Sequence, residues 1–406
     1  MWRRWRGSIG QVGHGHSYVV VGAGALGSAT AYWLTRAGAS DVLVLEQYDL
    51  GHDRGASEDH SRIIRHAYHW SAYTALTQAA YDAWADIEAE TGLQLTLRTG
   101  GLDLAVAGTA GESELDNYRR SLAPFGIPAE DLAAAEIRRR WPGWRIGDDV
   151  VGLYQPDAGI LDIRRGNAAH RALARRGGAQ FRPRTAVRGI SDRTRGVTLT
   201  TDSGTVDADH VVLCVASWLP ALLGDLGLGW RLTLSQEQVS YFATANVRDF
   251  APGRFPVWMW HGESVFYGFP VYGEVAVKAA RGMTGRFVTQ QTRSFEPDPA
   301  ETDLVASFLR ERLPGAVGPE LYSKTCVYDM PPDRDFIIDR VPGHPQITVG
   351  IGAGHAAKFA SLLGKILADL ATGGRTAYPI AAFRAGRPAL TDPLFKPVFR
   401  MAGPPG

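Results

Sequence analysis

The sequence predicts a mixed α/β (α+β) fold with two interleaved domains, one of Rossmann type and one built on an antiparallel sheet. A strand, glycine-rich turn, helix and second strand follow one another near the amino terminus. Alternating apolar and polar residues, typical of half-buried strands, fill the middle of the chain. The 406 residues exceed the needs of one small core, which fits two domains.

The first predicted unit is "YVVVGAGALGSATAYWLTRAGASDVLVLE". Tyr18–Val21 is a short β-branched strand, residues 25–38 form a helix that Gly38 closes, and residues 41–46 form a second strand. This order of elements within about 30 residues is typical of a dinucleotide-binding βαβ unit.

The glycines of this unit have the spacing G-x-G-x-x-G at Gly22, Gly24 and Gly27. The first permits a tight turn, the second lets the backbone approach a diphosphate, and the third lets helix and strand pack closely. Glu46 ends the second strand, where it can accept hydrogen bonds from a ribose. The motif predicts a bound dinucleotide and leaves FAD and NAD open.

Later elements follow the same two patterns. Residues 78–92 form a predicted helix that buries Ala80, Trp84 and Ile87 and ends at Gly92. The other predicted elements are an alternating stretch at 95–108, a helix and strand at 159–181, a buried strand at 210–218, an alternating strand at 274–280, a strand at 347–351 and a helix at 356–371.

Composition excludes several classes of protein. The formal charge of +1 argues against binding to nucleic acid, and no apolar run approaches the roughly 20 residues of a membrane span. Two cysteines are too few for a disulfide framework, so we expect a reducing cytoplasm. Residues 1–16 are basic without an apolar signal region, and we expect a flexible extension there. We see no oligomer signal and expect a monomer.

The segment "HDRGASEDHSRIIRHAYHWSAY" that follows Glu46 closely resembles the sarcosine oxidase family of flavin-dependent amine oxidases, which includes N-methyl-amino-acid and pipecolate oxidases. The resemblance spans roughly residues 18–390. It continues through "RRWPGW" (139–144), "YQPDAGIL" (154–161), "FYGFPVYGEVAVK" (266–278), "KTCVYDMPPDRDFIID" (324–339) and "GIGAGHAAKFA" (350–360).

The resemblance implies FAD as the cofactor and a division into two domains. The FAD-binding domain would use residues 17–90, 151–222 and 322–390, the catalytic domain 91–150 and 223–321, with a tail at 391–406. No metal site is predicted. The implied cofactor-binding residues are Gly22, Gly24, Ala25, Gly27, Glu46, Ser61, Arg62, Cys326, Gly352, Gly354 and Lys358.

The resemblance also implies covalent attachment of the flavin at Cys326, because in this family a cysteine two residues before a tyrosine holds the ring through an 8α thioether. The alternative is a buried structural thiol, the usual state of a free cysteine. The sequence departs from the family at Glu58, where covalent members often have histidine; His60 lies two residues further on. Another departure is Ala216, where the family usually has glycine.

The resemblance also implies an active site in which four basic residues have different roles. Arg65 and Lys358 would bind the substrate carboxylate, and Arg62 would lie against the flavin face opposite the substrate. Lys278 would stabilise the negative charge that develops on oxygen during its reduction, although its strand alone also suits an outward-facing edge lysine. The implied pocket walls are Tyr267, Tyr328, Trp258 and His355, with Trp70 adding bulk nearby.

These residues predict an FAD-dependent oxidase of a secondary amino acid, either N-methyl or cyclic, that passes electrons to O2 and forms H2O2. An enzyme of the same class acting on a fructosyl amino acid or on a biosynthetic intermediate is the first alternative. A flavin-binding subunit without turnover of its own is the second, and a nicotinamide-dependent dehydrogenase is the least supported.

Overall fold

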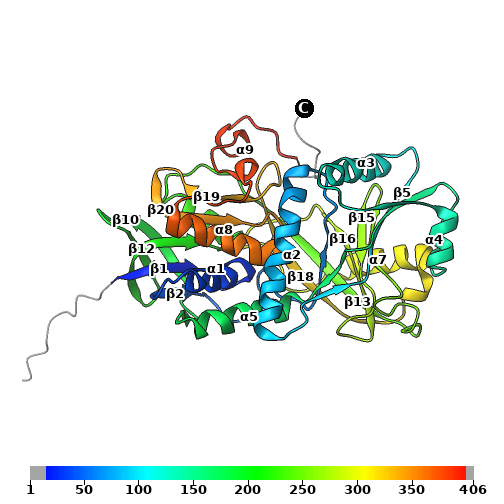
Figure 1. Ribbon diagram of the computed structural model, residues 1–406, viewed down its shortest axis with the longest axis horizontal. Helices are drawn as coiled ribbons and strands as arrows, with labels where there is room; N and C mark the ends of the chain where they lie inside the picture. Colours follow the sequence, from blue (N-terminus) through cyan, green and yellow to red (C-terminus); the bar gives the residue numbers. More distant parts are fainter. Residues whose placement is uncertain (1–14, 399–406) are drawn as a thin grey trace, which may run out of the picture.

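The computed structural model describes residues 15–398. It consists of two large sheets that lie side by side, with helices packed against them (Figure 1), and a small three-stranded sheet. The predicted mixed α/β fold is confirmed. Most of the predicted extension (1–16) and the last part of the predicted tail (391–406) lie outside the described residues.

The first sheet has eight strands, and its centre is parallel. β20, β12, β1, β2 and β9 run in one direction, while β10, β11 and β19 add antiparallel edges. Its strands are β1 (His16–Val21), β2 (Val42–Leu45), β9 (Gln180–Arg182), β10 (Val187–Asp192), β11 (Val197–Thr201), β12 (Gly204–Leu213), β19 (Ile337–Val341) and β20 (His344–Ile351). β2 is a buried Val/Leu run, and β1 and β12 end in buried runs at 19–21 and 211–213, as expected for strands that are covered on both faces of the sheet.

The helices α1 (Ala25–Arg36), α5 (Ile163–Arg176) and α8 (Ala360–Gly373) cover one face of this sheet (Figure 1). α1 and α8 approach closely at Gly364, where an added Cβ would lie 2.5 Å from the Cβ of Ala29. Small residues at this crossing therefore fix the position of α1, whose amino terminus carries the glycine turn.

The second sheet has nine strands and is mainly antiparallel. Its order is β17-β13-β16-β15-β14-β5-β7-β6, with β18 paired to β13. Its strands are β5 (Gly101–Val106), β6 (Glu130–Ala133), β7 (Val150–Gln155), β13 (Thr233–Ala243), β14 (Val257–His261), β15 (Val265–Gly268), β16 (Ala276–Gly282), β17 (Phe287–Val288) and β18 (Glu320–Met330).

The small sheet and the remaining helices connect the two large sheets. The small sheet pairs β3 (Arg62–Ile64), β8 (Gly159–Leu161) and β4 (Thr96–Arg98) in the order β3-β8-β4. The 21-residue helix α2 (Ser71–Thr91) stands between the two halves and contacts α8, α5 and α3 (Figure 1). The other helices are α3 (Ala110–Leu122), α4 (Ala134–Arg140), α6 (Pro220–Leu223), α7 (Pro299–Arg312), α9 (Pro388–Thr391) and the 3-10 turns η1 (Ala123–Phe125), η2 (Ala216–Trp218), η3 (Pro314–Ala316), η4 (Ala356–Phe359) and η5 (Ala381–Phe383).

The strands place two of the predicted domain boundaries inside the second sheet. Residue 151 lies in β7 and residue 322 lies in β18, and both strands pair with partners in the nine-stranded sheet. Cys326 therefore lies on a strand of this sheet. The division into a cofactor domain and a catalytic domain stays a prediction.

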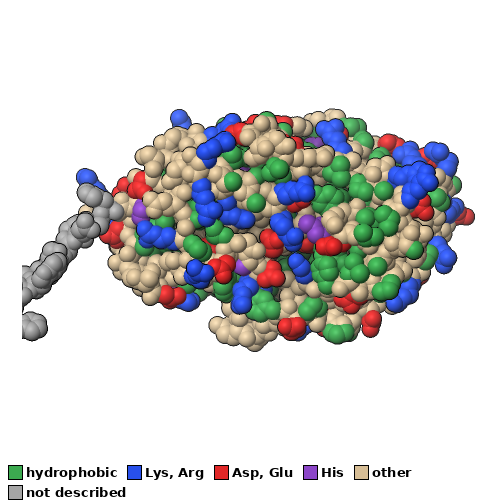
Figure 2. Space-filling view, turned by 90° about the horizontal axis from the view of Figure 1, so that it is seen from below, with side chains coloured by type: hydrophobic (Ala, Val, Ile, Leu, Met, Phe, Trp, Pro, Cys, Tyr) green, Lys and Arg blue, Asp and Glu red, His purple; other side chains and the backbone are tan. Residues whose placement is uncertain are grey.

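Charged side chains of both signs are interspersed on the face shown in Figure 2. This mixture matches a formal charge of +1 over 43 basic and 42 acidic residues. Within residues 15–398, no helix is both long and apolar enough to span a membrane.

Candidate active site

A cavity of about 920 Å³ extends from the first turn of α1 to the second sheet. A smaller cavity of about 160 Å³ adjoins it and shares Gly24, Ser57, Glu58 and Ala216 with it. Together the two cavities reach from the glycine turn to the strands of the second sheet. Such a site suits a dinucleotide with a second ligand beside its far end.

The glycine turn leaves space that a side chain would fill. Gly22 has a φ of +97°, and an added Cβ would lie 2.4 Å from the carbonyl oxygen of Cys214. A Cβ on Gly24 would lie 2.8 Å from Oγ of Ser57, and one on Gly27 would lie 1.8 Å from the oxygen of Gly22. The three glycines therefore have the roles that the sequence predicts, and a diphosphate can approach the backbone here.

Glu46 lies in the smaller cavity and is held in place from three sides. Its carboxylate accepts hydrogen bonds from the backbone N–H of Ala23 (2.8 Å) and of Tyr48 (3.0 Å), and lies 3.2 Å from Nε2 of His52. Burial raises the pKa of Glu46, but the His52 and backbone hydrogen bonds outweigh burial and lower it. The fixed carboxylate fits a ribose, so the residues present fit an adenosine at this end.

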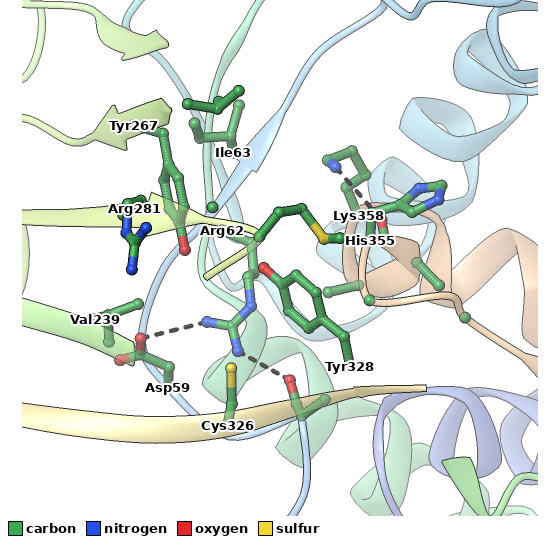
Figure 3. Close-up of a pocket in the computed structure, with 18 of the residues that line it drawn as sticks. Asp59, Arg62, Ile63, Val239, Tyr267, Arg281, Cys326, Tyr328, His355 and Lys358 are labelled. Atoms are coloured by element: carbon green, nitrogen blue, oxygen red, sulfur yellow. Dashed lines mark hydrogen bonds and ion pairs between the residues drawn. The ribbon is translucent and has the colours of Figure 1, made fainter. Parts of the chain in front are cut away.

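Arg62 occupies the middle of the larger cavity (Figure 3). Its guanidinium donates to the backbone oxygens of Ser61 (2.9 Å), Ala56 (3.0 Å) and Glu58 (3.2 Å), and lies 3.4 Å from the carboxylate of Asp59. Four acceptors fix its orientation, so its positive charge has a constant position beside any ring that enters the cavity.

Cys326 faces this guanidinium from β18 (Figure 3). Burial raises the pKa of the Cys326 thiol to about 12, although the nearby charge of Arg62 lowers it. The thiol is therefore protonated at neutral pH in the protein without ligand. Cys326 pairs across the sheet with Glu237 of β13, a carboxylate that is 2% exposed and bonded to Ser235 and to the N–H of Thr284.

Lys358 lines the cavity on the side of η4. Its ammonium donates to the hydroxyl of Tyr68 (2.9 Å) and the carbonyl of His355 (3.4 Å), and no carboxylate of residues 15–398 forms an ion pair with it. Burial and then the charges of Arg65 and Arg62 lower the pKa of Lys358 to about 7. An anionic ligand would relieve this uncompensated positive charge.

Arg65 already has partners of its own. Its guanidinium donates to Asp103 (2.9 Å) and to the hydroxyl of Tyr118 (3.1 Å), and His261 lies 2.9 Å from the same carboxylate. These groups are buried, yet Arg65 and His261 also line the cavity. The two cations that are predicted to bind the substrate carboxylate thus line one cavity. Arg65 is paired with Asp103, whereas Lys358 forms no ion pair within residues 15–398.

Lys278 is 3% exposed, and its side chain reaches into the cavity from β16. Its ammonium lies 2.5 Å from the carboxylate of Asp59 and 2.8 Å from the carbonyl of Ser61. Burial lowers the pKa of Lys278 to about 8, the charge of Arg62 lowers it, and Asp59 raises it. The alternative of an outward-facing edge lysine is therefore wrong.

Three of the four predicted pocket walls line the cavity: Tyr267, Tyr328 and His355. The structure corrects the placement of Trp258. Its ring packs edge-on against Trp144, with a centroid distance of 5.4 Å, inside the core of the second sheet. Side chains alternate along β14, so the next residue, Met259, reaches the cavity instead.

The histidine that could have replaced Glu58 does not reach the cavity. His60 is packed between Tyr241 and Tyr272, and neither ring nitrogen has a hydrogen-bond partner among the residues that the structure describes. Glu58 itself lines both cavities and pairs with Arg164 at 2.5 Å. Trp70 packs against Tyr73 and Phe383, away from the cavity.

The remaining predicted cofactor residues divide into two groups. Gly352 and Gly354 line the larger cavity at the turn before η4, together with Ala25 at the start of α1. Ser61 lies behind the cavity wall, where its carbonyl binds both Arg62 and Lys278. The structure adds residues that sequence analysis missed: Ser57, Asp59, Tyr68, Asp103, Tyr118, Tyr241 and His261.

A parallel sheet with a dinucleotide turn, joined to a cavity lined by cations and tyrosines, defines a flavin-dependent oxidoreductase. Comparison with known proteins supports this class. Residues 17–370 match the family described as FAD dependent oxidoreductase. The chain therefore belongs to this family, and the resemblance and the cofactor, FAD, are confirmed.

Two curated relatives are similar over nearly their whole length. A monomeric sarcosine oxidase of Streptomyces avermitilis is 34% identical over 91% of this chain and 96% of its own. An N-methyl-L-tryptophan oxidase of Salmonella agona is 30% identical over 92% of this chain and 99% of its own. The class predicted from the sequence, an FAD-dependent amine oxidase, is the class to which both relatives belong.

A solved structure of NikD, described as an unusual amino acid oxidase essential for nikkomycin biosynthesis, has a TM-score of 0.80 and 27% identity, covering 91% of this chain and 97% of that one. The L-proline dehydrogenase from P. horikoshii also has a TM-score of 0.80, at 18% identity, with 91% and 96% covered. The second likeness shows the shared fold alone.

Proposed function

We propose that this chain oxidises a secondary amino acid, with FAD as the hydride acceptor and O2 as the electron acceptor, and forms H2O2. The observation that carries the proposal is Lys358, an ammonium that forms no ion pair with any carboxylate of residues 15–398 and lines the cavity of Arg62, Lys278 and Cys326. A carboxylate is the ligand that this ammonium lacks.

FAD, when bound, supplies the site that accepts a hydride from the carbon next to nitrogen. The residues of the chain bind and orient the substrate. Lys358 holds the carboxylate as a point charge, and Arg65 adds a guanidinium on the same cavity. Tyr267 and Tyr328 exclude water from the reacting carbon. The substrate nitrogen reacts as the neutral amine, so activity rises with pH through the amine pKa.

Purified protein can be assayed for peroxide with N-methyl amino acids, pipecolate, proline and glycated amino acids. We expect turnover with at least one N-methyl or cyclic amino acid and none with the matching amine that lacks a carboxylate. Equal rates with and without the carboxylate would contradict the proposal. The names of the relatives, sarcosine oxidase and N-methyl-L-tryptophan oxidase, favour an N-methyl substrate.

We also propose that Cys326 holds the flavin covalently. The thiol lies in the larger cavity beside Arg62, and the same cavity begins at Gly24 of the glycine turn. An absorbance spectrum before and after acid precipitation tests this. Flavin that stays with the wild-type pellet but is released from Cys326→Ser supports the linkage; flavin released from both contradicts it.

One alternative of the same class has a specific observation in its favour. NikD is named as an oxidase of a biosynthetic pathway, and Met259 and His261, rather than the bulky Trp258, line this cavity from β14. Glycated amino acids and cyclic imino acids in the same peroxide assay distinguish the alternatives. A flavin-binding subunit without turnover would give no peroxide with any compound of the panel.

The oligomeric state and the cellular location of the protein also stay proposals. We expect a monomer, as one relative's name states for that protein, and size-exclusion chromatography with light scattering tests it. Both cysteines are free, which suits the reducing cytoplasm that we expect from the sequence.

A further inference from the structure

One face of α3 lines the larger cavity beside the second sheet. Ala110, Gly111, Glu114 and Tyr118 line it, and their spacing of three to four residues places them on the same side of the helix. The helix lies close to β14, since a Cβ added to Gly111 would be 2.0 Å from the carbonyl oxygen of His261. Glu114 therefore brings a carboxylate to the part of the cavity wall that α3 and β14 share.

The carboxylate of Glu114 has a hydrogen bond but lacks a cation. It accepts from the side-chain amide of Asn117 at 3.1 Å, and it forms no ion pair with a basic side chain of residues 15–398. Glu114 is half-buried. Burial raises its pKa by more than the Asn117 amide and the nearby charges of His261 and Arg65 lower it. A cation bound beside Glu114 would compensate the cost of this burial.

The two basic groups that act on Glu114 are already held by another carboxylate. Arg65 donates to Asp103 at 2.9 Å, and Nε2 of His261 lies 2.9 Å from the same oxygen. Arg65, Asp103 and His261 are at most 6% exposed. Breaking such a buried group is costly, so neither cation can turn to Glu114. The missing cation must therefore come from a ligand.

The unpaired ammonium of Lys358 lies near the same arginine. The guanidinium carbon of Arg65 is 5.6 Å from the ring centroid of Tyr68 and 5.0 Å from that of Tyr118. Lys358 donates to the hydroxyl of Tyr68, and Glu114 lies one helical turn before Tyr118. A ligand that extends along Arg65 thus meets a positive charge beside Tyr68 and a negative charge beside Tyr118.

We propose that Glu114 binds a second cationic group of the substrate, so that the preferred substrate is a secondary amino acid whose side chain carries an amino or guanidino group. The inference rests on the proposed function, in which Lys358 holds the substrate carboxylate. Glu114 then selects by charge, because it attracts a basic side chain and repels an acidic one. Glu263, in the turn after β14, adds a second acidic side chain to the cavity wall.

An acid on the solvent side of a helix is the plain alternative, and α3 carries such acids. Glu112 accepts from the N–H of Gly108 at the start of the helix, and Asp116 pairs with Arg119. Neither of these acids lines the cavity, whereas Glu114 does. Asp116 therefore provides a matched control on the same helix.

Calorimetric titration of the flavin-loaded chain with carboxylates that lack an α-amino group tests the inference without turnover. The probes are γ-aminobutanoate, δ-aminopentanoate and ε-aminohexanoate, each compared with the acid in which a methyl group replaces the ammonium. We expect at least one amino carboxylate to bind about tenfold more tightly than its neutral partner, as a hydrogen bond between charged groups allows. This ratio should decrease with added salt, because Glu114 is only half-buried.

Glu114→Gln should reduce the affinity ratio to about one, and Glu114→Lys should favour a dicarboxylate over the amino carboxylate of the same length. Asp116→Asn removes one carboxylate from the same helix and should leave the ratio unchanged. Thermal midpoints close to that of the wild type show that the variants are folded. Equal affinities for amino and neutral carboxylates in the wild type, or a ratio that persists in Glu114→Gln, would overturn the inference.

The results also separate this inference from the proposed function. Peroxide from neutral N-methyl or cyclic amino acids, combined with equal affinities for amino and neutral carboxylates, would keep the function and refute the role of Glu114. Amino carboxylates that bind through Glu114, without peroxide from any secondary amino acid, would refute the reaction and keep the charge-selective site. Absence of binding by every carboxylate would refute both, since Lys358 would then hold no carboxylate.

Discussion

Some residues of the site belong to sequence motifs, and others stand at positions that no motif contains. Gly22, Glu46 and Cys326 lie where short local patterns place them, because a turn or a strand fixes each one. Asp59 gave no signal, because its partners Lys278 and Tyr241 are 219 and 182 residues away in the sequence. A carboxylate in a polar segment acquires its role only when the two sheets meet.

Ala216 illustrates how a departure from a family pattern becomes a physical prediction. It is the first residue of η2 and has a φ of +45°, a left-handed conformation that an alanine adopts at a cost of roughly 1–2 kcal/mol. Glycine has no such cost but loses more entropy on folding, about 0.4–1 kcal/mol. We expect Ala216→Gly to raise the free energy of unfolding by about 0.5–1 kcal/mol in urea titrations.

The control is Ala85→Gly, on the exposed face of α2. This change should lower the free energy of unfolding by about 1 kcal/mol, since the backbone there is helical. A loss of stability in both variants would show that Ala216 is not strained.

Lys358 gives a pH-dependent prediction. Its pKa of about 7 means that the free protein loses the ammonium proton above neutrality, whereas a bound carboxylate keeps it. Binding of a substrate analogue that retains the carboxylate and lacks the amine should weaken up to about tenfold per pH unit above 7. Calorimetric titration at several pH values measures this dependence.

Replacement of Lys358 tests the same interaction. We expect Lys358→Met to weaken the analogue about 10- to 100-fold at pH 6 and to remove the pH dependence, because a charged hydrogen bond contributes roughly 1.5–3 kcal/mol. Lys358→Arg keeps a positive charge and should restore part of the affinity. A pH dependence that persists in Lys358→Met would assign it to another group.

At the scale of helices and strands, the sequence predicts the elements that have a clear local pattern. The β1–α1–β2 unit and the β20–α8 segment lie within a few residues of their predicted bounds, because apolar periodicity and terminal glycines mark them. The end of α2 at Gly92 was predicted as well, but the helix begins at Ser71, seven residues before the predicted start. The side of β14 that faces the cavity was assigned wrongly, since Trp258 and Met259 are both apolar. Only the pairing of β14 with β5 and β15 decides which one turns inward.

The packing of α8 against α1 is the element-scale contact that most directly supports the cofactor site. An added Cβ at Gly364 would lie 2.5 to 2.7 Å from Ala29 and the N of Thr30, so the two helices must separate. We expect Gly364→Ala to cost about 1–3 kcal/mol of unfolding free energy, as overpacking does. It should also weaken FAD binding, because α1 carries the glycine turn.

The matched control lies on the same helix. Gly373 is the last residue of α8, and an added Cβ there meets nothing within 4 Å. Gly373→Ala should leave stability within about 0.5 kcal/mol and FAD affinity unchanged. Urea titration and flavin fluorescence of both variants measure the difference. Similar losses in the two variants would mean that the contact with α1 does not explain the effect, since alanine favours a helix more than glycine does.

At the scale of the whole molecule, the site exists because two sheets of different construction share one cavity. The glycine turn belongs to the parallel sheet, whereas Lys278 and Cys326 belong to the nine-stranded sheet. The sequence predicts the residues on each side, but their distances depend on how α2 and the small sheet hold the halves together. The Asp59–Lys278 pair is one of the contacts that set this geometry, since β16 contributes one partner and the segment before β3 the other.

The shared cavity predicts that FAD stabilises both halves at once. In Cys326→Ser stripped of flavin, FAD at 100 times its dissociation constant should add about 2.7 kcal/mol to the free energy of unfolding. Hydrogen exchange followed by mass spectrometry should show slower exchange in β1 and the start of α1, and also in β13 and β18, because the cofactor fills a cavity that both sheets line. Protection confined to residues 16–60 would mean that the cofactor occupies only the smaller cavity and the turn. The larger cavity, which Lys278, Lys358 and Cys326 line, would then hold another ligand. The proposed roles of these three residues in flavin chemistry would all be wrong.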